Sequence, residues 1–102
     1  MPVLATIDLK VDDLAALVAA KKELMDPVAE PLFAENGHVW QLVVRTDDGV
    51  RLLNLWGDAA GRDRANADPR LAAARDAVLE RTGAEASYAS YEVVAITETT
   101  RA

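Results

Sequence analysis

Asn54, Trp56 and His38 are the residues whose types and positions could do chemistry. Asn54 stands inside the apolar run 52–55, where a buried carboxamide without a partner would be costly, so it either bonds a neighbour or lines a polar pocket. On a strand, Trp56 projects to the same side as Asn54 and is either a core aromatic or a platform for an aromatic ligand. His38 is either a proton acceptor near neutral pH or a solvated turn residue.

A predicted β-hairpin positions all three residues. Its two arms, 38–45 and 50–56, are rich in Val, Leu and Trp. They flank the sequence Thr-Asp-Asp-Gly at 46–49, which is typical of a hairpin turn.

The register of this hairpin decides which side chains share a face, because a slip of one residue exchanges the faces. A type I turn with Gly49 as a left-handed bulge would place Trp40 on the face of Asn54. A two-residue turn would place Gln41 there instead. We favour the first register, and therefore expect Trp40 and Leu52 to bind substrate beside Asn54.

A strand and a helical region precede the hairpin. Residues 2–11 alternate between apolar and polar side chains, as in a strand with one apolar face. Residues 12–25 have the spacing of an amphipathic helix capped by one of its first two aspartates. The dipeptide Asp-Pro at 26–27 indicates a fresh helical start, and Pro31 and 36–37 end the region.

Two helices and a strand follow the hairpin. The alanine-rich residues 59–67 predict one or two helical turns. Asp68-Pro69 is an N-cap followed by proline at the first helical position, which predicts a helix as far as Gly83. Residues 87–97 have the β-branched and aromatic content of a strand. The polar tail 98–102 either stays free or reaches a partner.

The order strand, helix, strand, strand, helix, strand predicts one ferredoxin-like α+β domain over residues 1–102, with a four-stranded antiparallel sheet and helices on one face. The hairpin is apolar on both faces, so the face without helices would expose several hundred Å² of apolar surface. We therefore expect a homodimer through the sheet face, in the dimeric α+β barrel arrangement.

Composition excludes several classes of function. A net charge of −6 and a pI of about 4.6 argue against nucleic acid or anionic lipid as partners. Without cysteine the chain has no disulfide, thiolate nucleophile or cysteine metal site, and a reducing cytoplasmic location is expected. No apolar run approaches the roughly 18 residues of a membrane span. The sequence also lacks a glycine-rich phosphate loop, a metal cluster and a nucleophile triad.

Residues 48–83 carry a further pattern: Asp-Gly, an apolar strand with Asn54, then Trp56, then the sequence Arg-Ala-Asn-Ala-Asp-Pro-Arg at 64–70. This pattern resembles the antibiotic biosynthesis monooxygenase family of dimeric α+β barrels. It is similar to the anthrone-oxidising enzymes of aromatic polyketide pathways, in which a Trp ends the third strand and Ala-Asp-Pro-Arg opens the last helix. The resemblance implies oxidation of an aromatic phenol, anthrone or quinol by O₂ without metal, flavin or other cofactor.

The resemblance differs in strength from residue to residue. Trp56 matches the family tryptophan directly in position. The asparagine of the anthrone enzymes lies farther upstream of the tryptophan, so Asn54 is matched to it only because it shares a strand face with Trp56. His38 has no family counterpart. We nevertheless expect all three to be catalytic. Tyr88 and Tyr91 lie on opposite faces of the last strand, and we assign Tyr91 to substrate binding. The last helix lacks the iron-ligating histidine of the haem-degrading relatives.

Two other functions stay open at this point. The same pocket could serve an isomerase or cyclase that enolises its substrate without O₂, or a dimer that binds a small molecule without converting it. We interpret Arg45, Arg51, Arg70 and Arg75 as solvated or interface charges.

Overall fold

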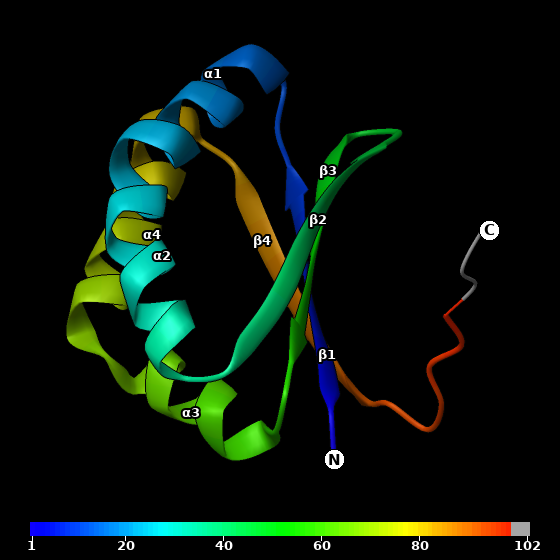
Figure 1. Ribbon diagram of the computed structural model, residues 1–102. Helices are drawn as coiled ribbons and strands as arrows, with labels where there is room; N and C mark the ends of the chain where they lie inside the picture. The colour runs from blue at the N-terminus through cyan, green and yellow to red at the C-terminus, as the bar shows by residue number, and fades with distance from the viewer. Residues whose placement is uncertain (99–102) are drawn as a thin grey trace, which may run out of the picture.

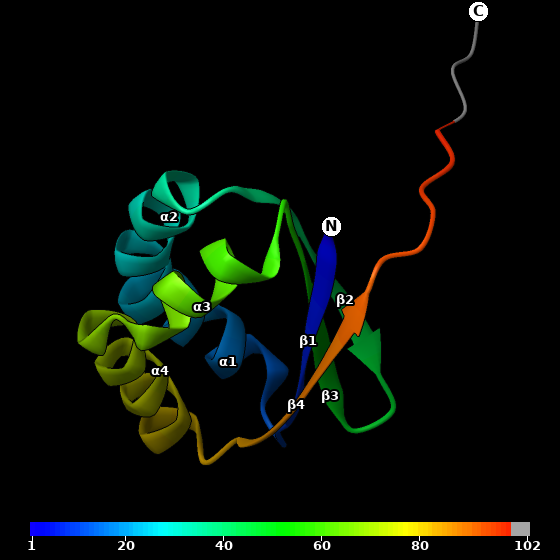
Figure 2. The ribbon, with the colours of Figure 1, turned by 90° about the horizontal axis from the view of Figure 1, so that it is seen from below.

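A four-stranded antiparallel sheet with its helices on one face makes up the computed structural model, which describes residues 1–98 (Figures 1 and 2). Its elements are β1 (Val3–Lys10), α1 (Leu14–Ala20), the π-helical segment η1 (Lys21–Met25), α2 (Asp26–Glu35), β2 (His38–Thr46), β3 (Gly49–Trp56), α3 (Ala59–Ala67), α4 (Pro69–Thr82) and β4 (Glu85–Glu92). The strand order β2-β3-β1-β4 confirms the predicted ferredoxin-like fold. The end of the predicted tail, residues 99–102, lies outside the described residues.

The first helical region ends before 36–37 as predicted, but it is more continuous than predicted. Asp26-Pro27 does begin a new α-helix, but η1 joins it to α1 without a gap. Pro31 lies inside α2, which continues to Glu35. Proline removes one backbone hydrogen bond there, and the burial of Ala29 and Leu32 on the same helix offsets that loss.

The last strand begins and ends earlier than predicted. β4 pairs with β1 residue by residue, from Lys10 opposite Glu85 to Val3 opposite Glu92. One more hydrogen bond follows, from the amide of Val93 to the carbonyl of Pro2. Because Pro2 has no N–H to donate in return, the ladder stops there, and the chain leaves the sheet on the side away from the helices (Figures 1 and 2).

The register that we favoured for the hairpin is wrong. Thr46 pairs with Gly49 across a two-residue turn, so Gln41 lies opposite Asn54. Gly49 does not have the positive φ of a left-handed bulge. Position 49 requires glycine for a steric reason, because a Cβ there would lie 1.8 Å from the backbone oxygen of Leu9.

The irregularity in this hairpin lies at its other end. The register shifts between His38 and Trp40, so that His38 pairs with Trp56 while Trp40 pairs with Leu55. Residues that pair directly project to the same face of a sheet. The shift therefore turns His38 toward the helices and Trp40 away from them.

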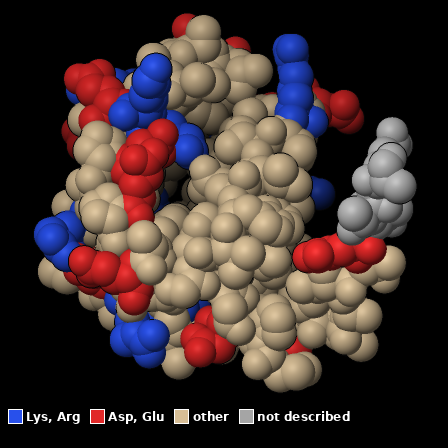
Figure 3. Space-filling view, viewed as in Figure 1, with Lys and Arg blue, Asp and Glu red and all other residues tan. Residues whose placement is uncertain are grey.

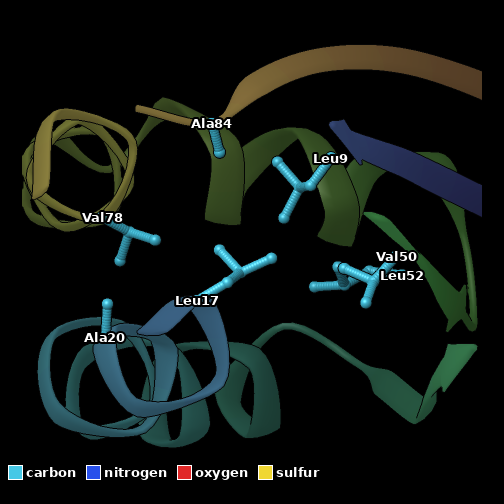
Figure 4. Close-up of a cluster of buried hydrophobic side chains, with 7 residues drawn as sticks. All are labelled: Leu9, Leu17, Ala20, Val50, Leu52, Val78 and Ala84. Carbon is cyan, nitrogen blue, oxygen red and sulfur yellow. The ribbon is translucent and has the colours of Figure 1, made fainter. Parts of the chain in front are cut away.

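Two clusters of buried side chains hold the helices on the sheet. The first contains Leu9, Leu17, Ala20, Val50, Leu52, Val78 and Ala84 (Figure 4). The second contains Val3, Ala29, Leu32, Trp56, Ala65 and Leu71. Leu52, expected as a substrate contact, is instead a core residue in the first cluster.

The predicted boundaries of the last helix are confirmed. The Asp68 carboxylate accepts a hydrogen bond from the backbone amide of Arg70 at 2.9 Å, and Gly83 ends the helix with φ of 67°. A hydrogen bond from the Arg70 side chain, reinforced by this backbone bond, holds the pKa of Asp68 below its ordinary value. The cap therefore stays ionised, the form that favours the N-terminus of a helix.

The sheet face opposite the helices carries exposed apolar side chains: Trp40, Leu42, Val44 and Tyr91. The side chain of Leu42, for example, is 51% exposed. Near the turn, Arg51 and Asp8 form an ion pair across strands at 2.6 Å, and this hydrogen bond lowers the pKa of Asp8. Within residues 1–98, the helices are too short or too polar to span a membrane.

Candidate functional site

A cavity of about 490 Å³ lies between the helices and strands β1, β3 and β4. Its volume is in the range of about 300–1,000 Å³ that small-molecule sites occupy. The lining residues on which its chemistry depends are Ala5, Asn54, Trp56, Arg62, Arg75 and Tyr88.

The floor of this cavity is a row of side chains across the sheet. Asn54 on β3 pairs with Ala5 on β1, and Ala5 pairs with Ser90 on β4. All three project toward the helices. Because the central side chain is only a methyl group, open space remains between Asn54 and Ser90, which are about 10 Å apart at two strand spacings.

Asn54 presents its amide nitrogen to this space. Its side-chain oxygen accepts hydrogen bonds from Gln41 Nε2 and from His38 Nε2, each at 2.9 Å. The second contact requires the hydrogen of His38 to be on Nε2, since the oxygen of a carboxamide has none to donate. Asn54 is only 4% exposed, and its Nδ2 donates to none of the residues 1–98. In the described residues, no side-chain nitrogen or oxygen is both buried and without a hydrogen-bond partner, so Nδ2 is accessible. The space to which Asn54 is exposed is the cavity that it lines.

Trp56 serves both as core and as cavity wall. It is 2% exposed and packs edge-on against Phe33, with ring centroids 4.8 Å apart, and against His38, at 5.0 Å. Trp56 is therefore a core residue that also lines the cavity, and its role as a platform for an aromatic ligand stays a prediction. Its packing fixes the indole rigidly beside Asn54, and rigid aromatic walls suit planar ligands.

His38 lies beside the cavity wall but outside the cavity. It lines a separate hollow of about 320 Å³ with residues of α2 and η1. Figure 3 shows a hollow between α2 and β2, with acidic and basic side chains at its rim. His38 therefore acts on the main cavity from behind its wall, through its hydrogen bond to Asn54 and its ring contacts with Trp56 and Phe33.

Two expected substrate contacts lie on the face of the sheet opposite this cavity. Trp40, which is 39% exposed, and Tyr91 project from the side of the sheet without helices, because their partners across the strands are Leu55 and Leu4. Tyr88 lines the cavity instead. The two tyrosines do lie on opposite faces as predicted, but the cavity side belongs to Tyr88.

Two arginines form a basic wall that the sequence analysis missed. Arg62 on α3 donates to Asp63, with distances of 2.9 and 3.0 Å, and also to the hydroxyl of Ser90. Arg75 on α4 lies over the ring of Tyr88, 5.5 Å from its centroid, and donates to Asn66 Oδ1 at 3.4 Å.

Helical spacing would have identified Arg75. It lies four residues after Leu71 and three before Val78, both buried, so all three are on one face of α4. Its interpretation as a solvated charge is therefore incomplete, because the aliphatic part follows the buried stripe while the guanidinium reaches the cavity. No such signal marks Arg62, whose partner Ser90 is far away in the chain.

Together these groups suit a planar aromatic molecule. Trp56 offers a flat wall, Asn54 an amide donor, and the arginines positive charge at the far side. Among residues 1–98, no three side chains of His, Asp or Glu are grouped to hold a metal ion.

Comparison by sequence finds no matching family model and no matching curated protein. Comparison by structure finds three informative matches. SnoaB, a cofactor-independent oxygenase from Streptomyces nogalater, is 17% identical, with a TM-score of 0.72 over 93% of this chain and 95% of that chain. A "putative antibiotic biosynthesis monooxygenase" from Deinococcus radiodurans is 20% identical, with a TM-score of 0.70 over 99% and 100% of the two chains. A dimeric ferredoxin-like protein from an uncultured marine organism is 10% identical, with a TM-score of 0.71 over 99% and 100%. The chain therefore has the ferredoxin-like fold found in antibiotic biosynthesis monooxygenases, as the resemblance of residues 48–83 implied.

Proposed function

We propose that this protein is a cofactor-independent monooxygenase that oxidises an aromatic phenol, anthrone or quinol with O₂. The observation that carries the proposal is the orientation of Asn54, whose oxygen is held by two donors while its amide nitrogen reaches a cavity walled by Trp56. An amide donor fixed in this way stabilises negative charge that develops on a substrate oxygen. The fold shared with a cofactor-independent oxygenase supports the same conclusion.

The proposed reaction takes its electrons from the substrate. The CH₂ of an anthrone loses a proton to solvent and becomes an enolate, and the enolate passes one electron to O₂ to form superoxide and a substrate radical. These combine into a peroxide anion at the same carbon, which takes one proton back from solvent and loses water to leave a carbonyl. In sum CH₂ and O₂ become C=O and H₂O, and the substrate supplies all four electrons.

Each residue has a separate part in this scheme. Asn54 Nδ2 donates to the enolate oxygen and lowers the barrier to its formation. Trp56 holds the ring plane and excludes water. His38 does not touch the substrate and is a positioning residue, because it bonds Asn54 Oδ1 and keeps the carboxamide from rotating.

Oxygen consumption with anthrone tests this function directly. We expect the purified protein, in buffer with EDTA, to consume one O₂ for each anthraquinone formed, above the rate of heat-denatured protein. With ¹⁸O₂, one labelled oxygen should enter the quinone. Product formation from an enolisable substrate without O₂ would instead indicate an isomerase or cyclase, and binding of aromatics without conversion would indicate a binding protein.

The orientation of Asn54 gives a second prediction. Gln41→Glu places an acceptor where Gln41 Nε2 donates, so the Asn54 carboxamide should turn its NH₂ toward position 41 and its oxygen toward the cavity. We expect kcat with anthrone to fall about tenfold, equivalent to roughly 1.4 kcal/mol. Gln41→Leu is the control, because it removes one donor but leaves His38 in place. Equal activity in the two variants would contradict the role of orientation.

We also propose that the protein is a homodimer through the exposed sheet face. The face of Trp40, Leu42, Val44 and Tyr91 is apolar, and a protein of the same fold is dimeric. Sedimentation should give a dimer for the wild type and a monomer for Leu42→Glu, since a charge at the centre of an apolar interface is unfavourable. A monomeric wild type at about 100 μM would contradict the proposal, since that concentration corresponds to only about −5.5 kcal/mol of binding.

A further inference from the structure

We infer that the aromatic substrate carries a carboxylate and that Arg75 binds it, at the side of the cavity opposite Asn54. The inference rests on the proposed function, because it assigns the substrate class of the same cavity. Three observations carry it: the charge balance of the lining, the free donors of Arg75, and the distance across the cavity floor.

The cavity lining is positive although the protein is negative. Its charged members are Arg62, Asp63 and Arg75, which sum to +1, whereas the whole chain has a net charge of −6. Asp63 is committed to Arg62 by two hydrogen bonds. The cavity is therefore a favourable binding site for an anion in an otherwise acidic protein. Partial enclosure of the cavity strengthens the electrostatic field inside it.

Of the three charged residues that line the cavity, Arg75 is the one that forms no ion pair with residues 1–98. Its contacts there are the face of Tyr88 and a long hydrogen bond to Asn66. A guanidinium has five donors, so most of those of Arg75 stay available. Its planar fork fits a carboxylate with two parallel hydrogen bonds, which is the strongest pairing that arginine makes.

Arg62 is the other residue of the basic wall, and its hydrogen bonds hold that wall in place. It bonds Ser90 on β4 and Asp63, and its side chain is 20% exposed. Its donors are mostly used, so it adds positive field without being the principal ligand contact. It also keeps α3 against the edge strand, which preserves the space in front of Arg75.

The distance across the floor sets the spacing of the two substrate groups. Asn54 and Ser90 are two strands apart, about 10 Å, with only Ala5 between them. Arg62 bonds Ser90 and Arg75 lies over the ring of Tyr88, and both partners are on β4, so the two arginines lie on the β4 side of the cavity. A fused ring system with its enolising oxygen at one end and its carboxylate at the other end spans this gap.

Two probes that differ in one group test the inference. 6-Hydroxy-2-naphthoate and 2-naphthol share a ring system and a hydroxyl, but only the first has a carboxylate. By calorimetry under nitrogen, we expect the wild type to bind the naphthoate about tenfold more tightly or better. This preference should weaken as KCl rises from about 50 to 300 mM, because salt screens the charge pair. Equal affinity for both probes would overturn the inference without any variant.

Variants locate the effect on Arg75. Arg75→Gln should lower the affinity for the naphthoate to about that for 2-naphthol and so abolish the preference. Arg81→Gln, on the same helix but outside the cavity, removes the same charge and should keep the preference. A preference that survives in Arg75→Gln, or disappears equally in Arg81→Gln, would contradict the assignment.

Binding without O₂ separates this inference from the proposed function. If the preference holds but no substrate consumes O₂, the monooxygenase proposal fails and the carboxylate site stands. If anthrone is oxidised but the two probes bind equally, the carboxylate site fails and the monooxygenase proposal stands.

Discussion

Asn54→Asp is expected to lower kcat with anthrone by about 100-fold to 1,000-fold, the usual cost of removing one donor to a developing oxyanion. The aspartate keeps an acceptor for Gln41 and His38, so the hydrogen bonds behind it remain. In the cavity, however, an oxygen replaces the NH₂ and repels the enolate. Initial rates of O₂ uptake at saturating anthrone measure the effect.

A matched substitution controls for the change of amide to carboxylate. Asn36→Asp makes the same chemical change outside the cavity: its oxygen can still accept from Arg64, and the bond it loses is the one from Nδ2 to the Leu32 carbonyl, which is no part of the cavity. We expect its kcat to stay within about twofold of the wild type, since nothing in the transition state touches it. If Asn54→Asp retained a third of the wild-type rate while circular dichroism showed a folded protein, Asn54 would not be the enolate donor.

Gly49→Ala is expected to lower the free energy of unfolding by about 3 kcal/mol, at the upper end for overpacking. The new Cβ would lie 1.8 Å from the backbone oxygen of Leu9, and a backbone atom cannot move aside without separating β1 from β3. The same separation would shift Asn54 relative to Ala5, so activity should fall as well. Urea unfolding followed by circular dichroism measures the stability.

Gly57→Ala is the control for this prediction. A Cβ at Gly57 would approach only the backbone oxygen of Gly37, at 3.4 Å, a contact that a small adjustment relieves. Its unfolding free energy should remain within about 0.5 kcal/mol of the wild type. Equal losses in the two variants would show that the close approach at Gly49 is not what requires glycine there.

Local signals account for most of the fold. Asp68-Pro69 and Gly83 define the last helix because capping and left-handed φ depend on a few neighbouring residues. The alternation of apolar and polar residues predicted β1, because this pattern also depends on neighbouring residues alone. The end of β4 could not be predicted in this way, because it is set by the pairing with β1, which ends at Pro2 on a distant part of the chain.

The register of the hairpin decides which side chains support Asn54 from outside the cavity. The turn at 46–49 is compatible with either register, so the sequence leaves open whether Trp40 or Gln41 lies beside Asn54. In the folded protein, Gln41 is the neighbour and donates to Asn54, and the bulge beside His38 brings the imidazole back to the same face. The pairing of β4 with β1 places Tyr88 rather than Tyr91 on the cavity side.

The sequence by itself determined the types of element, their order, and the pair Asn54 and Trp56 on one face, because periodicity and capping act over a few residues. Only the tertiary structure decided which side chains meet them, including Gln41 and the basic wall of Arg62 and Arg75. These residues come from β2, α3 and α4, and the physical reason is strand register and helix packing, which depend on backbone contacts between distant parts of the chain.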